Sequence, residues 1–216
     1  CDKAQVCGNA RVCGNALVYD EALVCDNAQV CDNARVCGEA WVYGEALVCD
    51  NAQVCGNARV CGNALVCDNA LVCDKAQVCG NARVCGNALV CDNALVCDKA
   101  RVYGEARVYG NARVYGNAQV YGNAQVCDKA RVYGNAQVCD KARVTTTPLV
   151  ISGLEYAVTV CDNQVQIGCK TVPATTQLSA DLLPDETCPV LRACAHTLIP
   201  LIQAHYARVQ AEARHD

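Results

Sequence analysis

A six-residue repeat fills the first two-thirds of the chain and constrains its fold more than any other feature. The segment Cys1–Val144 consists of 24 consecutive hexads without an insertion or a deletion. Each hexad has Cys or Tyr at position one, Gly or Asp at position two, and Asn, Lys or Glu at position three. Ala stands at position four, a variable residue at position five and Val at position six. Such fixed-period self-similarity is typical of a solenoid.

The period of six favours short strands separated by corners. An α-helix turns about 100° per residue, so a six-residue pattern would drift around it. Ala and Val lie two positions apart and face the same side of an extended strand. The Gly/Asp and the following Asn/Lys/Glu are expected to make the corner, because Gly and Asn accept a positive φ at little cost. We therefore expect buried Ala and Val and an exposed position five; their strict register argues against a disordered segment.

This pattern resembles the hexapeptide-repeat left-handed β-helix, in which an aliphatic residue stands four places before a small one. Val6 and Ala10, and Val12 and Ala16, fit that spacing. In that family three hexads form one triangular coil of 18 residues. The resemblance therefore implies an all-β solenoid over residues 1–144: a left-handed parallel β-helix of about eight triangular coils, with equivalent residues stacked every 18.

The composition changes at Thr145–Pro148, where Thr and Pro interrupt the hexads. Residues 145–216 are expected to form a small α+β capping unit, a β-hairpin plus a helix. The hairpin is predicted within Leu149–Val160 and Val165–Cys169, a loop over Thr171–Asp185, and the helix over Leu191–Val209, kinked or divided at Pro200. Its apolar stripe is expected to cover the open end of the last coil. The candidate interaction residues on this helix are Leu198, Leu201 and Ile202.

A second resemblance rests on the Tyr-Gly-Asn-Ala-Arg/Gln-Val run at 103–138, followed by Thr-Thr-Thr-Pro and by Cys161–Cys169. These segments resemble repeat proteins of enterobacterial prophages. In those tails a His often follows the Ile-Gly-Cys sequence. Here Lys170 follows, so no role tied to that His is transferred to this chain.

Cysteine is unusually frequent, with 21 residues, of which 17 stand at position one of a hexad. Cysteines 18 apart are expected to stack about 4.8 Å apart, aimed poorly for a disulfide. We therefore predict free thiols and a reducing cytoplasm. Tetrahedral zinc needs about four converging ligands, and a straight row offers two. No metal site is predicted, and binding of a soft metal by the Cys ladders is kept as an alternative. Tyr replaces Cys at Tyr19, Tyr43, Tyr103, Tyr109, Tyr115, Tyr121 and Tyr133.

No catalytic or cofactor-binding residues can be assigned. Many left-handed hexapeptide β-helices are trimeric acyltransferases with a His as general base, which is one alternative function. The three histidines of this chain are His196, His205 and His215, and none lies on the coils. The repeats contain 14 basic and 15 acidic residues, well interspersed, which argues against a nucleic-acid partner. No apolar run reaches membrane-spanning length, and no small-molecule substrate is indicated.

The leading hypothesis is a non-enzymatic structural or interaction protein, a rigid cytoplasmic rod that self-associates or scaffolds a partner. Position five is chemically mixed along each side, which argues against a flat ligand-binding stripe. Trp41 is a candidate interaction residue, with an ordinary exposed aromatic as the alternative. A homo-oligomer is expected, formed through a coil end or the C-terminal cap. Cys1 opens directly into a hexad, so either two N-terminal ends meet or residues before Cys1 cap the rod.

Overall fold

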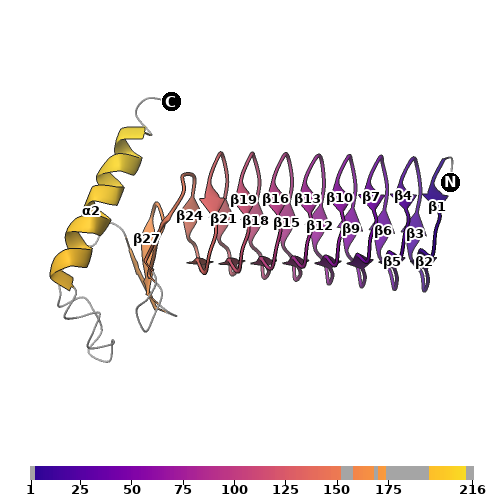
Figure 1. Cartoon of the computed structure of the whole chain (residues 1–216), viewed down its shortest axis with the longest axis horizontal. Coiled ribbons are helices and arrows are strands. Elements are labelled where there is room, and N and C mark those ends of the chain that lie inside the picture. The colour runs from indigo at the N-terminus through magenta and orange to yellow at the C-terminus, as the bar shows by residue number, and fades with distance from the viewer. Residues whose placement is uncertain (1–2, 152–157, 168–169, 174–194, 213–216) are drawn as a thin grey trace.

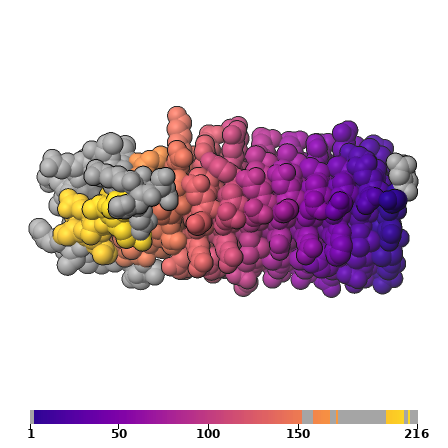
Figure 2. All heavy atoms as spheres, turned by 90° about the horizontal axis from the view of Figure 1, so that it is seen from above, coloured from indigo at the N-terminus to yellow at the C-terminus, as the bar shows by residue number. Residues whose placement is uncertain are grey.

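The chain forms a straight rod of stacked coils that ends in a small sheet and a helix (Figure 1). The computed structural model describes residues 3–151, 158–167, 170–173 and 195–212. The first coil lies at one end of the rod, and the C-terminal unit lies at the other. Figure 2 shows the same rod as a continuous solid body without a gap between successive coils.

Three parallel sheets of eight strands make the three sides of the rod, and each strand is two residues long. The first sheet contains β1 (Gln5–Val6), β4 (Leu23–Val24), β7 (Trp41–Val42), β10 (Arg59–Val60), β13 (Gln77–Val78), β16 (Leu95–Val96), β19 (Arg113–Val114) and β22 (Arg131–Val132). The second contains β2 (Arg11–Val12), β5 (Gln29–Val30), β8 (Leu47–Val48), β11 (Leu65–Val66), β14 (Arg83–Val84), β17 (Arg101–Val102), β20 (Gln119–Val120) and β23 (Gln137–Val138). The third contains β3 (Leu17–Val18), β6 (Arg35–Val36), β9 (Gln53–Val54), β12 (Leu71–Val72), β15 (Leu89–Val90), β18 (Arg107–Val108), β21 (Gln125–Val126) and β24 (Arg143–Val144).

The register of these sheets is 18 residues throughout. Val6 pairs with Val24, Val60 with Val78, and Val126 with Val144. Each strand therefore consists of position five and the following Val, and one coil uses three hexads. The predicted solenoid of eight 18-residue coils is confirmed, whereas the left-handed sense of the coil stays a prediction.

The core of the rod is a column of Ala and Val side chains. From Ala22 to Val144 every hexad Ala and Val is at most 1% exposed, which confirms the predicted inward face. The first coil differs, because Val6 is 49% and Val12 is 37% exposed. Position five is exposed at the arginines, but most of its leucines are half-buried, so the prediction of a uniformly exposed position was too simple. A leucine on the outside of a narrow coil is covered partly by its neighbours one coil away.

The corners are made at position two of the hexad. All 13 Gly and 10 Asp residues at this position in the described coils have a positive φ. The expectation that Asn shares this conformation was wrong for the described residues. Asn instead forms side-chain amide ladders, as from Asn9 Nδ2 to Asn27 Oδ1 at 3.2 Å. Asp tolerates the left-handed region and adds a contact, because its carboxylate accepts a hydrogen bond from the corner N–H one coil later, as Asp68 does from Gly86 at 2.8 Å.

The C-terminal unit contains a four-stranded antiparallel sheet rather than the predicted hairpin. Its strands, in spatial order, are β25 (Leu149–Ile151), β26 (Val158–Val160), β27 (Gln164–Ile167) and β28 (Lys170–Pro173). Residues 171–173 were predicted as loop but pair with β27, because Val172 lies opposite Val165 and Thr171 lies opposite Gln166. The rest of that predicted loop, from 174 to 185, lies outside the described residues.

The helix α2 (Ala195–Glu212) continues through Pro200 and is not divided by it, which corrects one of the two predicted outcomes. Its predicted start at Leu191 lies outside the described residues. Ile202 is 5% exposed and packs with Val158, Val160, Val165 and Ile167 of the sheet. The helix therefore covers the small sheet, and the expectation that it lies directly on the last coil was wrong. Figure 1 places β27 between β24 and α2.

The small sheet, not the helix, closes the end of the coils. Cys161 is fully buried in the core of the coils, and the half-buried Val150 packs against the same core. Gln164 Nε2 donates to the carbonyl oxygen of Cys139 at 3.0 Å. Asp162 Oδ2 accepts from both the backbone N–H and the hydroxyl of Thr145, each at 2.7 Å. These hydrogen bonds satisfy polar groups at the coil end that would otherwise be free to pair with a further strand.

Two adjacent helix residues test this arrangement. Ile202→Asp is expected to detach α2 from the sheet, because it removes a burial worth about 1.5–3 kcal/mol and places a carboxylate in an apolar contact. Leu201→Asp should have little effect, because Leu201 is 48% exposed. Limited proteolysis, read by mass spectrometry, measures the release of the C-terminal unit. Equal resistance of both variants would contradict the packing of α2 on the sheet.

Candidate functional site

The corners of the rod gather the chemically most reactive side chains into three longitudinal rows. The 18-residue register stacks each position-one residue on the equivalent residue of the next coil. The first row contains Tyr19, Cys37, Cys55, Cys73, Cys91, Tyr109 and Cys127. The second contains Cys7, Cys25, Tyr43, Cys61, Cys79, Cys97, Tyr115 and Tyr133. The third contains Cys13, Cys31, Cys49, Cys67, Cys85, Tyr103, Tyr121 and Cys139.

All described cysteines are free thiols. Burial raises the pKa of Cys49 to about 12 and that of Cys31 to about 11, and the neighbouring Asp carboxylates add to both shifts. Burial likewise raises the pKa of Cys67 and of Cys73. Because the thiolate is the nucleophile, these thiols are weakly reactive near neutral pH. They are groups for packing or for metal coordination rather than for nucleophilic catalysis.

Several thiols contact the Asp that follows them in the sequence. Cys49 Sγ donates to Asp50 Oδ2 at 3.3 Å, and Cys73 Sγ donates to Asp74 Oδ2 at 3.4 Å. At two places within the described residues the thiol of the next coil joins the pair, so that three ligand atoms lie within 4.8 Å of one another. These thiol–carboxylate clusters are Cys67, Asp68 and Cys85, and Cys73, Asp74 and Cys91. The hexad pattern predicts the rows of thiols but not the carboxylate that joins them.

Tyrosine takes the place of cysteine near the C-terminal end of the coils and forms stacks. The rings of Tyr103 and Tyr121 lie 5.0 Å apart and nearly parallel, and those of Tyr115 and Tyr133 lie 5.4 Å apart. Tyr103 also donates its hydroxyl to Gln119 Oε1 at 3.2 Å, and Tyr121 accepts from Gln166 Nε2 at 3.2 Å. These contacts cover the corner with aromatic surface and tie the third row to the C-terminal sheet.

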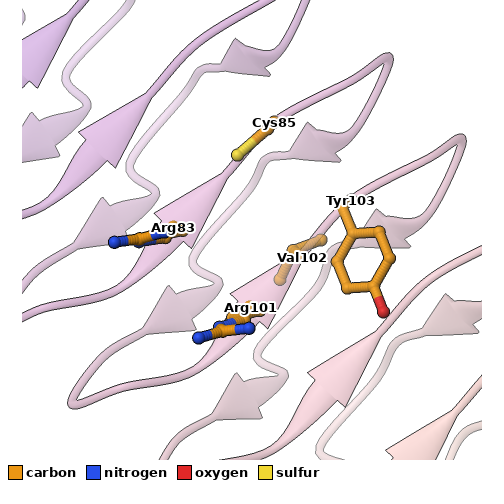
Figure 3. A pocket seen from close by; sticks show the side chains of 5 residues that line it. All are labelled: Arg83, Cys85, Arg101, Val102 and Tyr103. Carbon is orange, nitrogen blue, oxygen red and sulfur yellow. The ribbon is translucent and has the colours of Figure 1, made fainter.

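A shallow pocket lies on the second sheet, between the strands β14 and β17 and the corner beside them (Figure 3). Its lining residues are Arg83, Cys85, Arg101, Val102 and Tyr103. Arg83 and Arg101 are paired across the two strands, and their side chains point the same way in Figure 3. Within the described part of the chain neither guanidinium forms an ion pair with a carboxylate. The pocket thus offers two adjacent cations to a solvent-borne anion.

Trp41 lies on the outer face of the first sheet and is 44% exposed. The guanidinium of Arg59, one coil later, sits 5.1 Å from the centre of its ring, which is a cation–π contact. Trp41 is therefore available at the surface but already has one partner within the chain. The pocket at Arg83 and Arg101 is on a different sheet, so the structure does not bring these two features together.

The three candidate residues of the helix have different surroundings. Leu201 is exposed, Ile202 is buried against the small sheet, and the side chain of Leu198 lies outside the described residues. His205 is 8% exposed beside Tyr206, and its Nδ1 lies 3.3 Å from a guanidinium nitrogen of Arg208. His215 lies outside the described residues, as does the side chain of His196. No helix within the described ranges is long and apolar enough to cross a bilayer.

Charge is distributed unevenly along the rod. The first five coils, residues 1–90, contain six basic and ten acidic side chains, a net charge of −4. The last three coils, residues 91–144, contain eight basic and five acidic side chains, a net charge of +3. The overall count of basic and acidic residues hides this polarity, because the two parts nearly cancel. The rod therefore has an acidic and a basic portion.

Comparison with known proteins identifies the repeat. The family model described as YdcK Beta solenoid repeat matches residues 4–20, 10–26, 28–44, 52–68, 76–92, 106–122 and 124–140. Together these segments cover half of the chain, all of it within the coils. No curated protein matches the chain.

Proposed function

The chain belongs to the YdcK β-solenoid repeat family, and we propose that it is a non-enzymatic structural or interaction protein. In this proposal the coils are a rigid rod that holds its outer faces and its ends at fixed positions for a partner. The partner is a second copy of the same chain. Because one fold serves many functions, the proposal rests on this rod and not on family membership.

The observation that carries the proposal is the unbroken bonding between coils. Backbone N–H groups of one coil donate to carbonyl groups of the next along the whole length. The series begins with Gln5 N to Ala22 O at 2.9 Å and continues to Gln125 N to Ala142 O at 2.8 Å. No loop leaves the coils between residues 3 and 144 to shape a substrate site. A solenoid bonded in this way resists bending, because any bend stretches a row of hydrogen bonds on one side.

Two further properties belong to the same proposal. The coil is left-handed, as in the hexapeptide-repeat proteins that the Val and Ala spacing resembles, and the protein is related to the prophage repeat proteins through its Tyr-Gly-Asn-Ala-Arg-Val run. It works in a reducing cytoplasm, which is supported by the free thiols at the corners. Free, closely stacked thiols would be exposed to oxidation in a secreted protein.

The proposed self-association is supported by the charge distribution along the coils. Residues 1–90 carry a net charge of −4, and residues 91–144 carry a net charge of +3. These acidic and basic portions attract one another when two copies lie side by side and antiparallel.

Mass in solution at micromolar concentration, measured over a series of salt concentrations, tests the self-association, and electron microscopy of the same sample tests the rod. We expect particles with straight rods and a mass of at least two chains. Contact through a coil end should persist in high salt, whereas antiparallel side-by-side pairing should dissociate, because salt screens surface charges. A monomer at every salt concentration would overturn the self-association, and bent or globular particles would overturn the rigid rod.

A further inference from the structure

The two thiol–carboxylate clusters are the chemically most specific arrangement outside the proposed interaction surfaces. In each cluster two thiols come from successive coils and one carboxylate comes from the Asp that follows the first thiol. Asp68 and Asp74 are exposed, while Cys73, Cys85 and Cys91 are half-buried. A small ion could reach the carboxylate from solvent and be enclosed on its other side by sulfur.

We propose that each cluster binds one thiophilic divalent cation of the zinc and cadmium kind, through two thiolates and one carboxylate. Thiolates select soft and borderline ions of this kind, and a carboxylate is an ordinary third ligand for zinc. Three protein ligands leave a fourth position of the tetrahedral ion for water. The two thiol protons pass to solvent on binding, so that three negative ligands balance the two positive charges of the ion with a net charge of −1.

The distances in the clusters suit this ion. A Zn–S bond is about 2.3 Å long, so two sulfur ligands of a tetrahedral ion lie ~3.8 Å apart. The ligand atoms of each cluster already lie within 4.8 Å of one another without an ion. Rotation about the Cα–Cβ bonds of the two cysteines therefore brings the sulfurs to the required separation, and the parallel strands below them need not move.

The sequence places each cluster at the end of an uninterrupted run of thiols, where the next coil of the same row holds a tyrosine. Cys85 is followed one coil later by Tyr103, and Cys91 is followed by Tyr109. Replacing either Cys therefore disturbs one cluster and leaves the thiols further down the row stacked as before. Cys127 provides a matched control, because its Sγ contacts Asp128 Oδ2 at 3.5 Å but the equivalent places one coil away hold Tyr109 and Thr145. It has the carboxylate and lacks the second thiol.

The test uses the full chain, reduced and freed of metal, and titrates it with Cd²⁺ while the thiolate-to-cadmium charge-transfer absorption is recorded. Competition with a coloured chelator then gives the affinity for Zn²⁺, and native mass spectrometry counts the ions. We expect two ions per chain. Cys85→Ser and Cys91→Ser should each bind one ion, and the double variant none. Cys127→Ser should bind two, like the original protein.

The carboxylates are tested separately. Asp68→Asn and Asp74→Asn should each weaken one site by about tenfold or more, since even outer-shell partners of a metal contribute that much. Asp128→Asn is the control and should bind as before. Cys85→Tyr repeats the loss of one ion with a residue that this row accommodates elsewhere, and circular dichroism verifies that each variant is folded.

Three results would overturn the proposal. The first is the absence of charge-transfer absorption with excess Cd²⁺. The second is the retention of both ions in the double Cys85→Ser and Cys91→Ser variant. The third is unchanged affinity in both Asp→Asn variants, which would leave a two-thiol contact in place of the three-ligand site.

Discussion

Val78→Asp is expected to unfold the central coils of the rod. Val78 is fully buried and is paired with Val60 on one side and Val96 on the other, so the new carboxylate would meet only apolar groups. Burying an unpartnered polar group costs roughly 2–7 kcal/mol. The lost Val contact adds about 1.5–3 kcal/mol. Because each coil is stabilised by its neighbours, the damage should spread to the coils on both sides.

The matched control is Val6→Asp, which makes the same change at the same hexad position of the same sheet. Val6 is 49% exposed, so its carboxylate would remain solvated and the coils should stay folded. Hydrogen exchange read by mass spectrometry measures both variants segment by segment. Loss of protection over the middle of the rod in Val78→Asp, and its retention in Val6→Asp, is the expected pair of results. Full protection of the central coils in Val78→Asp would contradict the packed Ala–Val core.

The coils were predictable because the same hexad pattern occurs in 24 consecutive units. A single Val followed by an Ala four places later is weak evidence, but the unbroken series leaves no other way to bury all of these side chains. The coil of 18 residues is what the resemblance to the hexapeptide-repeat β-helix implies. Given that length, the order of strands in the first sheet follows from adding 18 to Gln5, which gives Leu23 and then Trp41.

The C-terminal unit was less predictable because it has no such repetition. The strand at Lys170–Pro173 contains a Pro and is short, and its pairing with β27 is decided by contacts that no local pattern specifies. The predicted packing partner of the helix, the last coil, was wrong for a similar reason. The apolar stripe with Ile202 indicates that the helix is covered, but not whether a coil or a sheet covers it.

The candidate metal clusters depend on the direction of the Asp side chain, which the hexad pattern does not specify. The sequence places Cys67 and Cys85 in one row, and it places Asp68 at a corner. Whether that carboxylate turns toward the thiols depends on the positive φ at Asp68, which is +60° in the structure. A positive φ assigned to Asn leaves the direction of the Asp carboxylate unspecified, whereas a positive φ at position two turns that carboxylate toward the thiols.

The same corners give the second large prediction, at Gly86. Gly86 has a φ of +72°, and a Cβ placed on it would lie 2.9 Å from the backbone nitrogen of Gly104 one coil later. Gly86→Val is expected to destabilise the protein by about 2–6 kcal/mol. A non-glycine residue in the left-handed region costs about 1–3 kcal/mol, and overpacking adds about 1–3 kcal/mol. A β-branched side chain is the least tolerant of this backbone conformation.

Two control variants separate these contributions. Gly134→Val has the same backbone conformation, with a φ of +66°, but a Cβ there has no atom within 4 Å, so only the backbone cost should remain. Gly86→Asp carries the same Cβ, but it should cost less than either Val variant, because Asp32, Asp50 and Asp68 already follow one another in this row with φ near +60°. Its carboxylate can accept from the N–H of Gly104, as Asp68 accepts from Gly86.

Denaturant midpoints should therefore fall in the order Gly86→Asp, Gly134→Val, Gly86→Val, from most to least stable. A Gly86→Val variant as stable as Gly86→Asp would mean that the corner conformation does not limit the hexad, and that the alternation of Gly and Asp has another cause.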